Sequence, residues 1–382
     1  MDPIIIVGTG LAGYNLAKEY RKLNQARPLI LLTADDGRNY SKPMLSTGFT
    51  KQKSADELAL ADAATMAQQL NADVKTFVQV TAIDTAARTL TLSNHEQLTY
   101  GDLVLAWGAD VFRPPLAGDG VDQVYSVNDL LDYARFRAAV EGKKKVVIIG
   151  GGLIGCEFAN DLANGGFSVE VVEPLGRPLP TLLPEPASRA VQAGLESLGV
   201  QFHFGPHVKA VNRNGERLGV VLSDDTALDA EIVISAIGLR PRIKVAQDAG
   251  IAVNRGIRVD RHLRTSAANV YALGDCSEVE GNVMLYVLPL MAGARALAKT
   301  LAGEATAVDY GPMPVAIKTP VCPVVVAPVP VGVAGDWQIQ ADGANVNAQF
   351  IDATGVLRGF ALTGDATGEK NKLAKLLPPL LG

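Results

Sequence analysis

The chain contains the same glycine-rich segment twice, and this repeat limits the folds that it can adopt. Residues 4–13 read IIIVGTGLAG and residues 146–155 read VVIIGGGLIG, so both place G-x-G-x-x-G directly after an apolar strand. A helical pattern and then a second apolar strand follow each copy. A later apolar run recurs as well, at 103–108 and 232–238, and ends at a glycine in both places. This order of landmarks predicts two α/β units of the same kind, each with a parallel sheet.

The glycines in this turn suit phosphate binding. The first permits a tight turn, the second lets backbone N–H groups approach a pyrophosphate, and the third lets helix and strand pack closely. The helix that follows points its N-terminus at the phosphates. Purely structural turns are the alternative, but two copies in the same context favour two bound dinucleotides. The predicted contacts are Gly8, Gly10, Leu11, Ala12 and Gly13 in the first unit, and Gly150, Gly152, Leu153, Ile154 and Gly155 in the second.

An acidic residue indicates which dinucleotide the second unit prefers. Glu173 closes the second strand of that unit, about 20 residues after the glycines, where a carboxylate can hold ribose hydroxyls and repel a 2′-phosphate. This favours NADH over NADPH; an exposed acid at a strand end is the alternative. The first unit has Thr33 at the matching place and Asp35 two residues later, which leaves open how its adenosine is held.

The connections between these landmarks predict three domains. Residues 74–92 and 200–222 alternate in hydropathy like small antiparallel sheets, and prolines at 114, 115 and 241 suggest that the chain crosses between domains there. We therefore expect a discontinuous first domain, a second domain inserted into it, and a small α+β C-terminal domain that ends in a helix over 367–377. The predicted ranges are 1–112 with 240–311, 113–239, and 312–382.

Charge and hydropathy argue against several other classes of protein. A net charge of −5 gives no reason to expect nucleic acid or an anionic membrane as the main partner. The longest apolar stretch, residues 321–334, is interrupted by prolines and is shorter than the ~20 residues that a membrane helix needs. No secretion signal precedes the first strand, so we expect a cytoplasmic protein.

The cysteines and histidines predict neither a metal site nor thiol chemistry. Cys156, Cys276 and Cys322 are far apart in the sequence and form no C-x-x-C pair. We expect each of them to be a small buried apolar residue. The four histidines show no spacing typical of metal ligands.

The segment VYALGD at 270–275, with Thr265 before it, resembles the flavin motif of the FAD-dependent pyridine nucleotide oxidoreductases, in which the aspartate binds the ribityl chain of FAD. The resemblance extends over most of residues 1–310. It implies two Rossmann-like domains of the three-layer ββα, glutathione-reductase-like type, with FAD at the first glycine turn and NAD at the second. It also places Trp107, between Ala106 and Gly108, where the family usually has threonine.

Residues 38–46, RNYSKPMLS, separate the branches of this superfamily. They contain no cysteine, whereas disulfide reductases have C-x4-C here. They are similar to the S-K-P-x-L-S segment of the rubredoxin and flavorubredoxin reductases. This resemblance implies catalytic roles for Lys42, at the flavin ring, and for Glu157, at the nicotinamide carboxamide. The alternatives are a solvated lysine and an acid that stabilises a helix N-terminus.

The resemblance and the strand ends together give the cofactor contacts expected outside the glycine turns. They are Thr33, Asp35, Arg38, Lys42, Pro43, Val80, Ala106, Trp107, Gly108, Glu157, Glu173, Gly238, Gly274, Asp275, Pro289, Leu290 and Lys318.

These features predict FAD-dependent electron transfer from NADH to rubredoxin, within an alkane hydroxylase-type system. NADH gives up two electrons as a hydride and an iron centre accepts one, and a flavin can mediate between them. Reduction of a ferredoxin or a flavorubredoxin is the alternative. The expected partner is a small acidic iron protein, attracted to a basic rim made of Arg38, Lys42 and Lys318.

Overall fold

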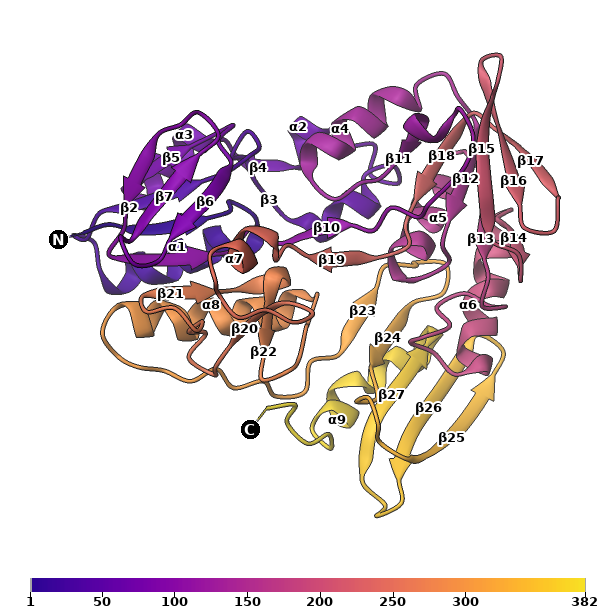
Figure 1. The fold of residues 1–382 in the computed structure, drawn as a ribbon. Helices are drawn as coiled ribbons and strands as arrows, with labels where there is room; N and C mark the ends of the chain where they lie inside the picture. The colour runs from indigo at the N-terminus through magenta and orange to yellow at the C-terminus, as the bar shows by residue number, and fades with distance from the viewer. Residues whose placement is uncertain (1, 382) are drawn as a thin grey trace.

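A computed structural model describes residues 2–381 (Figure 1). The first repeat forms a five-stranded parallel sheet with the order β21-β9-β1-β2-β5. Its two central strands, β1 (Ile4–Val7) and β9 (Asp102–Leu105), are buried along almost their whole length. The other strands are β2 (Leu29–Leu32), β5 (Asp73–Lys75) and β21 (Val270–Ala272).

The second repeat forms a sheet of the same design, with the order β11-β18-β12-β13-β14, again parallel throughout. Strand β12 takes the place of β1, and β13 that of β2. The predicted α/β fold class is therefore confirmed. The strands are β11 (Val124–Tyr125), β12 (Lys145–Ile149), β13 (Ser168–Glu173), β14 (Gln201–Phe204) and β18 (Ile232–Ser235).

The helices α1 (Leu11–Leu23) and α5 (Leu153–Asn164) begin at the glycine turns, as predicted. Helix α1 packs against α8 (Val287–Leu301), which closes one face of the first unit. No helix among the described residues combines the length and the apolar character of a membrane span. The other helices are α2 (Ala55–Leu58), α3 (Ala63–Leu70), α4 (Leu130–Ala139), α6 (Glu185–Ser197), α7 (Lys244–Asp248) and α9 (Lys370–Ala374); the short 3-10 helices are η1 (Lys42–Thr47), η2 (Val121–Gln123), η3 (Gly274–Cys276) and η4 (Gly364–Glu369).

Each unit carries a three-stranded antiparallel sheet, but its position differs from the prediction. Residues 73–75 and 201–204 belong to the parallel sheets as edge strands, and the third antiparallel strand lies further along the chain. An edge strand is half-buried and therefore alternates in hydropathy as an antiparallel strand does, so the pattern alone did not separate the two. The antiparallel strands are β6 (Val80–Asp84), β7 (Thr89–Leu92) and β8 (Gln97–Thr99), and β15 (Val208–Asn214), β16 (Arg217–Leu222) and β17 (Ala227–Ala230).

The chain passes between the two units along paired strands. Strand β10 (Ala109–Val111) leads out of the first unit, and β19 (Leu239–Pro241) returns to it, antiparallel and in register. The predicted domain boundaries near 112 and 240 lie beside this pair and stay a prediction. Short pairs elsewhere in the first part are β3 (Asn39–Tyr40) with β4 (Ala59–Ala61), and β20 (Ile257–Val259) with β22 (Ser277–Val279).

The C-terminal part is an antiparallel sheet of five strands in the order β23-β24-β27-β26-β25. Helix α6 of the second unit packs on strands of this sheet (Figure 1). The predicted helix over 367–377 is shorter than expected, because η4 and the five-residue α9 replace it and Gly368 lies inside that run. The strands are β23 (Val315–Ile317), β24 (Val324–Ala327), β25 (Gly335–Asp342), β26 (Asn345–Asp352) and β27 (Leu357–Thr363).

One hydrophobic core joins all three parts of the chain. It contains Leu45 and Phe49 from the first part, Tyr133 and Phe136 from the second, and Ile317 with other residues of the C-terminal sheet. The ring of Phe49 packs edge-on against three aromatic rings at centroid distances of 5.5 to 6.0 Å. Residues 42–58 belong to the first unit in sequence. They are nevertheless fixed to the second unit by this core.

Removing the Phe49 ring should weaken this junction. Phe49 is 3% exposed, so Phe49→Ala should lower the free energy of unfolding by about 3–5 kcal/mol, because it leaves a cavity among aromatic rings. Chemical denaturation followed by circular dichroism measures the change. Phe77→Ala is the control: Phe77 is 68% exposed, and its loss should change stability by less than about 0.5 kcal/mol. Equal effects of the two substitutions would contradict the role given to Phe49.

Candidate cofactor and active site

The two glycine turns have the same geometry. Gly8 has φ +119°, and a Cβ on it would lie 2.2 Å from the carbonyl oxygen of Ala106. A Cβ on Gly13 would lie 1.8 Å from the carbonyl oxygen of Gly8, and one on Gly155 would lie 1.9 Å from that of Gly150. The first and third glycines are thus required by the packing of the turn itself.

The middle glycines of the two turns differ, because a side chain on them would point into open space. Gly10 and Gly152 have no heavy atom within 4 Å of an added Cβ, and they form the N-caps of α1 and α5. Neither helix has a capping side chain or an acid in its first turn, so its N–H groups remain available to an anion. Both cradles fit a diphosphate.

A carboxylate at or just after the end of the second strand in each unit is hydrogen-bonded to the middle of the glycine turn. Glu173 is 6% exposed and accepts hydrogen bonds from the backbone N–H groups of Gly151, at 2.8 Å, and Leu175. Asp35 accepts from the Thr33 hydroxyl at 2.6 Å and from the Thr9 hydroxyl at 3.4 Å. Asp35 therefore occupies in the first unit the place that Glu173 occupies in the second, and Glu173 is not an exposed strand-end acid.

Asp275 and Lys42 face each other at the carboxyl end of the first sheet. The Asp275 carboxylate forms an ion pair with the Lys42 ammonium at 3.8 Å, and no other group of residues 2–381 donates a hydrogen bond to it. Burial raises the pKa of Asp275, and Lys42 opposes the rise. Burial, helped by Arg242, lowers the pKa of Lys42, which donates to the Asn128 side chain at 2.7 Å. A Cβ on Gly274 beside them would lie 2.9 Å from the Cβ of Ala12 at the start of α1.

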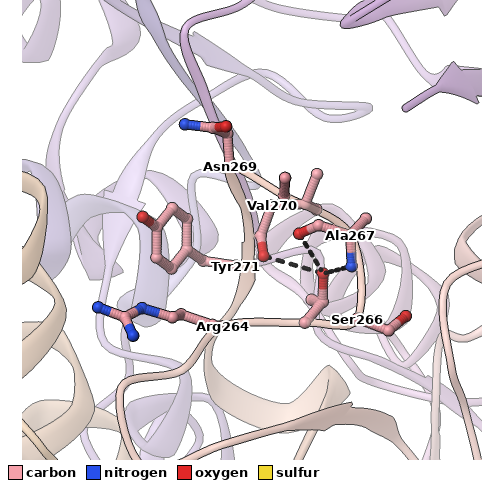
Figure 2. Close-up of a pocket in the computed structure, with 8 residues that line it drawn as sticks. Arg264, Ser266, Ala267, Asn269, Val270 and Tyr271 are labelled. Atoms are coloured by element: carbon pink, nitrogen blue, oxygen red, sulfur yellow. Dashed lines mark hydrogen bonds between the residues drawn. The ribbon is translucent and has the colours of Figure 1, made fainter. Parts of the chain in front are cut away.

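Thr265, the first residue of the flavin-type motif, has a structural role. Its hydroxyl donates to the carbonyl oxygen of Val270 at 2.9 Å and accepts from the N–H of Ala267, which closes the turn before β21 (Figure 2). A depression of about 330 Å³ is lined by residues 264–271. It lies at the amino end of β21, whereas Asp275 follows the carboxyl end, so it is not the cofactor site.

Glu157 is the most completely enclosed charged group of the site. It lies on the second turn of α5 and is 1% exposed. Its carboxylate accepts from the Ser46 hydroxyl at 2.6 Å and from the backbone N–H of Lys318 at 2.9 Å, and it forms an ion pair with the Lys318 ammonium. The three parts of the chain meet at this carboxylate. Glu157 is thus more than an acid that favours a helix N-terminus.

Trp107 forms hydrogen bonds beside the strands that connect the two units. Its indole N–H donates to the carbonyl oxygen of Arg242 at 2.9 Å, and the Arg242 guanidinium donates back to the carbonyl oxygen of Trp107 at 2.7 Å. Gly108 and Gly238, at φ +75° and +110°, make the turns on either side of the strand pair β10 and β19.

Several of the expected contact residues pack against or pair with other parts of the protein. The Val80 side chain is buried in the first core, and Pro289 and Leu290 are buried in the first turn of α8. Arg38 forms ion pairs with Asp36 and Asp56 at 2.7 and 2.6 Å. Since Lys42 and Lys318 also face carboxylates, these three side chains leave little uncompensated positive charge for the docking rim expected from the sequence.

Sequence reasoning missed three functional neighbours. Ser46 was visible only as the last letter of a motif, and nothing local marks Asn128 or Arg242. Each makes its contact across at least 86 positions of the sequence. The three cysteines are buried, and burial raises their pKa values, that of Cys276 to about 12, which disfavours reactive thiolates.

Comparison with known families agrees with this geometry. Residues 2–293 match the model described as "Pyridine nucleotide-disulphide oxidoreductase". The chain belongs to this family. Its predicted resemblance to FAD-dependent pyridine nucleotide oxidoreductases is therefore confirmed, and members of the family use FAD and NAD(H). The two open glycine cradles leave room for the diphosphate of a dinucleotide such as these cofactors.

Similar proteins cover the whole chain. It is 61% identical to a rubredoxin–NAD(+) reductase of Alcanivorax borkumensis, with 100% of both chains covered. It is 44% identical to one of Acinetobacter baylyi, with 100% of this chain and 99% of the relative covered. A solved ferredoxin reductase from Rhodopseudomonas palustris matches this chain with a TM-score of 0.88 at 26% identity. The match covers 99% of this chain and 96% of the ferredoxin reductase. Residues 307–377 also match a model described as "Rubredoxin binding C-terminal domain".

The burial of Asp275 predicts a conflict between stability and flavin binding. A folded-state pKa above the unfolded value means that the charged carboxylate lowers stability once the pH exceeds that folded-state pKa. Flavin-free Asp275→Asn should therefore unfold at a higher temperature than the flavin-free parent at pH 7. The difference should shrink as the pH falls through the raised folded-state pKa and the parent becomes protonated, and the variant should retain less FAD. Exposed Asp336→Asn is the control; an unchanged melting temperature for Asp275→Asn at pH 7 would be the contrary result.

The position of Glu173 predicts coenzyme preference. Glu173→Gln keeps the size of the side chain but loses the charge, so the preference for NADH over NADPH should fall by about ten- to a hundredfold, the worth of a hydrogen bond to a charged group. The rates of anaerobic flavin reduction by the two coenzymes measure it. Glu170→Gln, on the same strand but bonded to His203, should keep the parental ratio. If Glu173→Gln keeps it too, Glu173 does not select the coenzyme.

Proposed function

We propose that this protein transfers electrons from NADH to rubredoxin by way of bound FAD. The observation that carries the proposal is the C-terminal sheet, whose residues match the rubredoxin-binding domain, attached to a complete pair of dinucleotide-binding units. The two relatives reported above, which are similar to this chain over its full length, carry the name rubredoxin–NAD(+) reductase. When bound, FAD supplies a ring that takes up a hydride and releases electrons one at a time.

The residues of the chain bind and orient the reactants in this proposal. Asp275 hydrogen-bonds the ribityl chain of FAD, while Lys42 brings a positive charge to the side of the site where negative charge accumulates on reduction. Glu173 holds the adenosine ribose of NADH at the second turn. Glu157 accepts a hydrogen bond from the nicotinamide carboxamide. Each of these roles is a proposal that the geometry supports.

A thiol-based reaction has no support among the described residues. All three cysteines are buried, and the segment from Lys42 to Thr47, where a thiol would act, contains none. Ferredoxin and flavorubredoxin remain the alternative acceptors. The wider setting that we propose is an alkane hydroxylase-type system in the cytoplasm, where NADH is available and rubredoxin passes electrons on to the hydroxylase.

The docking surface needs another source of positive charge than the rim first expected. Lys370, Lys372 and Lys375 on and beside α9 are all exposed, and they lie within the residues that match the rubredoxin-binding domain. Lys372 forms an ion pair with Glu369 at 3.5 Å, whereas Lys370 and Lys375 form none among the described residues. Rubredoxins are acidic as a class, and this chain carries a net charge of −5, so a local basic surface is needed to attract them. We assign the first encounter to Lys370 and Lys375.

The test compares electron carriers under anaerobic conditions. The purified protein should be yellow, NADH should bleach it, and it should reduce rubredoxin with a higher kcat/KM than ferredoxin. The kcat/KM for rubredoxin should fall as salt rises, because attraction between surface charges is screened over about 8–10 Å at 0.1–0.15 M salt. Bleaching by NADH, which needs no protein partner, should change little.

Charge reversal locates the docking surface. Lys370→Glu with Lys375→Glu should lower kcat/KM for rubredoxin at low salt by about tenfold and leave the rate of bleaching by NADH unchanged. Lys22→Glu with Lys244→Glu, two exposed lysines outside the C-terminal sheet, is the matched control and should have little effect. If rubredoxin is reduced no faster than by free reduced flavin, the proposed acceptor is wrong. If both double variants behave alike, only the docking surface is wrong.

A further inference from the structure

The hydrogen bonds at Glu157 leave one acceptor position unused. A carboxylate offers about four acceptor positions on its two oxygens. Oε2 accepts from the Ser46 hydroxyl and from the Lys318 ammonium, and Oε1 accepts from the Lys318 backbone N–H. A second position on Oε1 is left without a partner among the described residues. The three bonds fix the plane of the carboxylate and so fix the direction of this remaining position.

Ser46 makes the contact from inside the protein. It is 4% exposed, and its hydroxyl lies 2.6 Å from Glu157 Oε2. Lys318, with a side-chain exposure of 28%, reaches the same oxygen from the open side. Ile154 lies one helical turn before Glu157 on α5 and is 41% exposed, so this end of the helix is open next to the second glycine turn. Ser46 is therefore the fixed partner, and Lys318 is the partner that a ligand can approach.

The backbone at Ser46 departs from its helix. Its φ and ψ are −93° and 23°, outside the helical range, one residue before the end of η1. Residues in this sparsely allowed region occur often at active sites. The segment is held on the second unit on either side of Ser46: Lys42 donates to Asn128, and the backbone N–H groups of Phe49 and Thr50 donate to the buried Asp161. The hydroxyl is thus delivered to Glu157 by a segment that cannot shift freely.

We propose that Ser46 is a positioning residue for the nicotinamide of NADH, acting through Glu157. Its hydroxyl bond to Oε2 orients the carboxylate so that the remaining position on Oε1 accepts the carboxamide NH2. This inference rests on the proposed function, because it assumes that NADH binds at the second glycine turn with its nicotinamide next to Glu157. The proposed role concerns a single hydrogen bond, the one that the carboxamide NH2 donates to Glu157.

The experiment uses a coenzyme without that donor. In 3-acetylpyridine adenine dinucleotide a methyl group replaces the carboxamide NH2, so this ligand cannot donate to Glu157. Isothermal titration calorimetry of the FAD-loaded protein with NAD+ and with this analogue gives two dissociation constants, with no electron acceptor present. Ser46→Ala should weaken NAD+ about tenfold, because a hydrogen bond to a charged group becomes misdirected, and should leave the analogue unchanged.

Two further variants keep the comparison selective. Ser46→Thr retains the hydroxyl and should bind both ligands as the parent does. Thr47→Val removes the neighbouring hydroxyl, which donates to the carbonyl oxygen of Met44 on the same short helix, and should affect neither ligand. The FAD content and melting temperature of each variant report on folding. If Ser46→Ala does not fold, Ser46→Cys, a weak donor, allows the same comparison.

The outcomes separate this inference from the proposed function. If Ser46→Ala weakens both ligands equally, or neither, the positioning role is wrong, even when the parent still reduces rubredoxin. If the parent reduces no rubredoxin but the selective loss for NAD+ is found, the acceptor is wrong and the role of Ser46 stands. If the parent binds no NAD+, both fail together.

Discussion

The close approach of two backbones at each glycine turn is the constraint on which the rest of this structure depends. The helix can start where it does only because Gly13 and Gly155 have no Cβ, which would lie 1.8 and 1.9 Å from the carbonyl oxygens of the first glycines. This contact places the N-termini of α1 and α5 at the carboxyl ends of their sheets, each facing space lined by a second glycine. An anion site thus results from backbone packing and needs no charged side chain.

One short segment of the first unit packs against the second unit and joins the two. Residues 42–58 belong to the first unit in sequence, but they pack in the hydrophobic core of the second unit. Phe49 lies there among aromatic rings, and its backbone N–H donates a hydrogen bond to Asp161. The C-terminal sheet contributes Lys318 to the same place. The site around Glu157 and Lys318 is therefore built from all three parts of the chain, and its geometry depends on all three being folded.

Sequence reasoning succeeded where the determinants are local. The glycine turns, their strands and Glu173 lie within one βαβ unit, whose spacing fixes their geometry in advance. It failed where partners are distant or compete. Nothing local relates Glu157 to Lys318, which is 161 positions away, and the charge of Arg38 gave no sign that Asp36 and Asp56 neutralise it. The edge strands β5 and β14 were assigned to the antiparallel sheets, because a half-buried edge strand alternates in hydropathy as an antiparallel strand does.

The strand pair β10 and β19 brings the entrance and the exit of the second unit together, with Asp110 opposite Arg240. A protein segment whose two ends meet can be added to a host loop without stretching the host, and it can be replaced in the same way. Four strands lie in the same order in the two sheets, β9-β1-β2-β5 in the first and β18-β12-β13-β14 in the second. Gene duplication followed by insertion of one copy into the other accounts for both facts. The same junction offers protein engineers a place to exchange the coenzyme-binding unit as a single cassette.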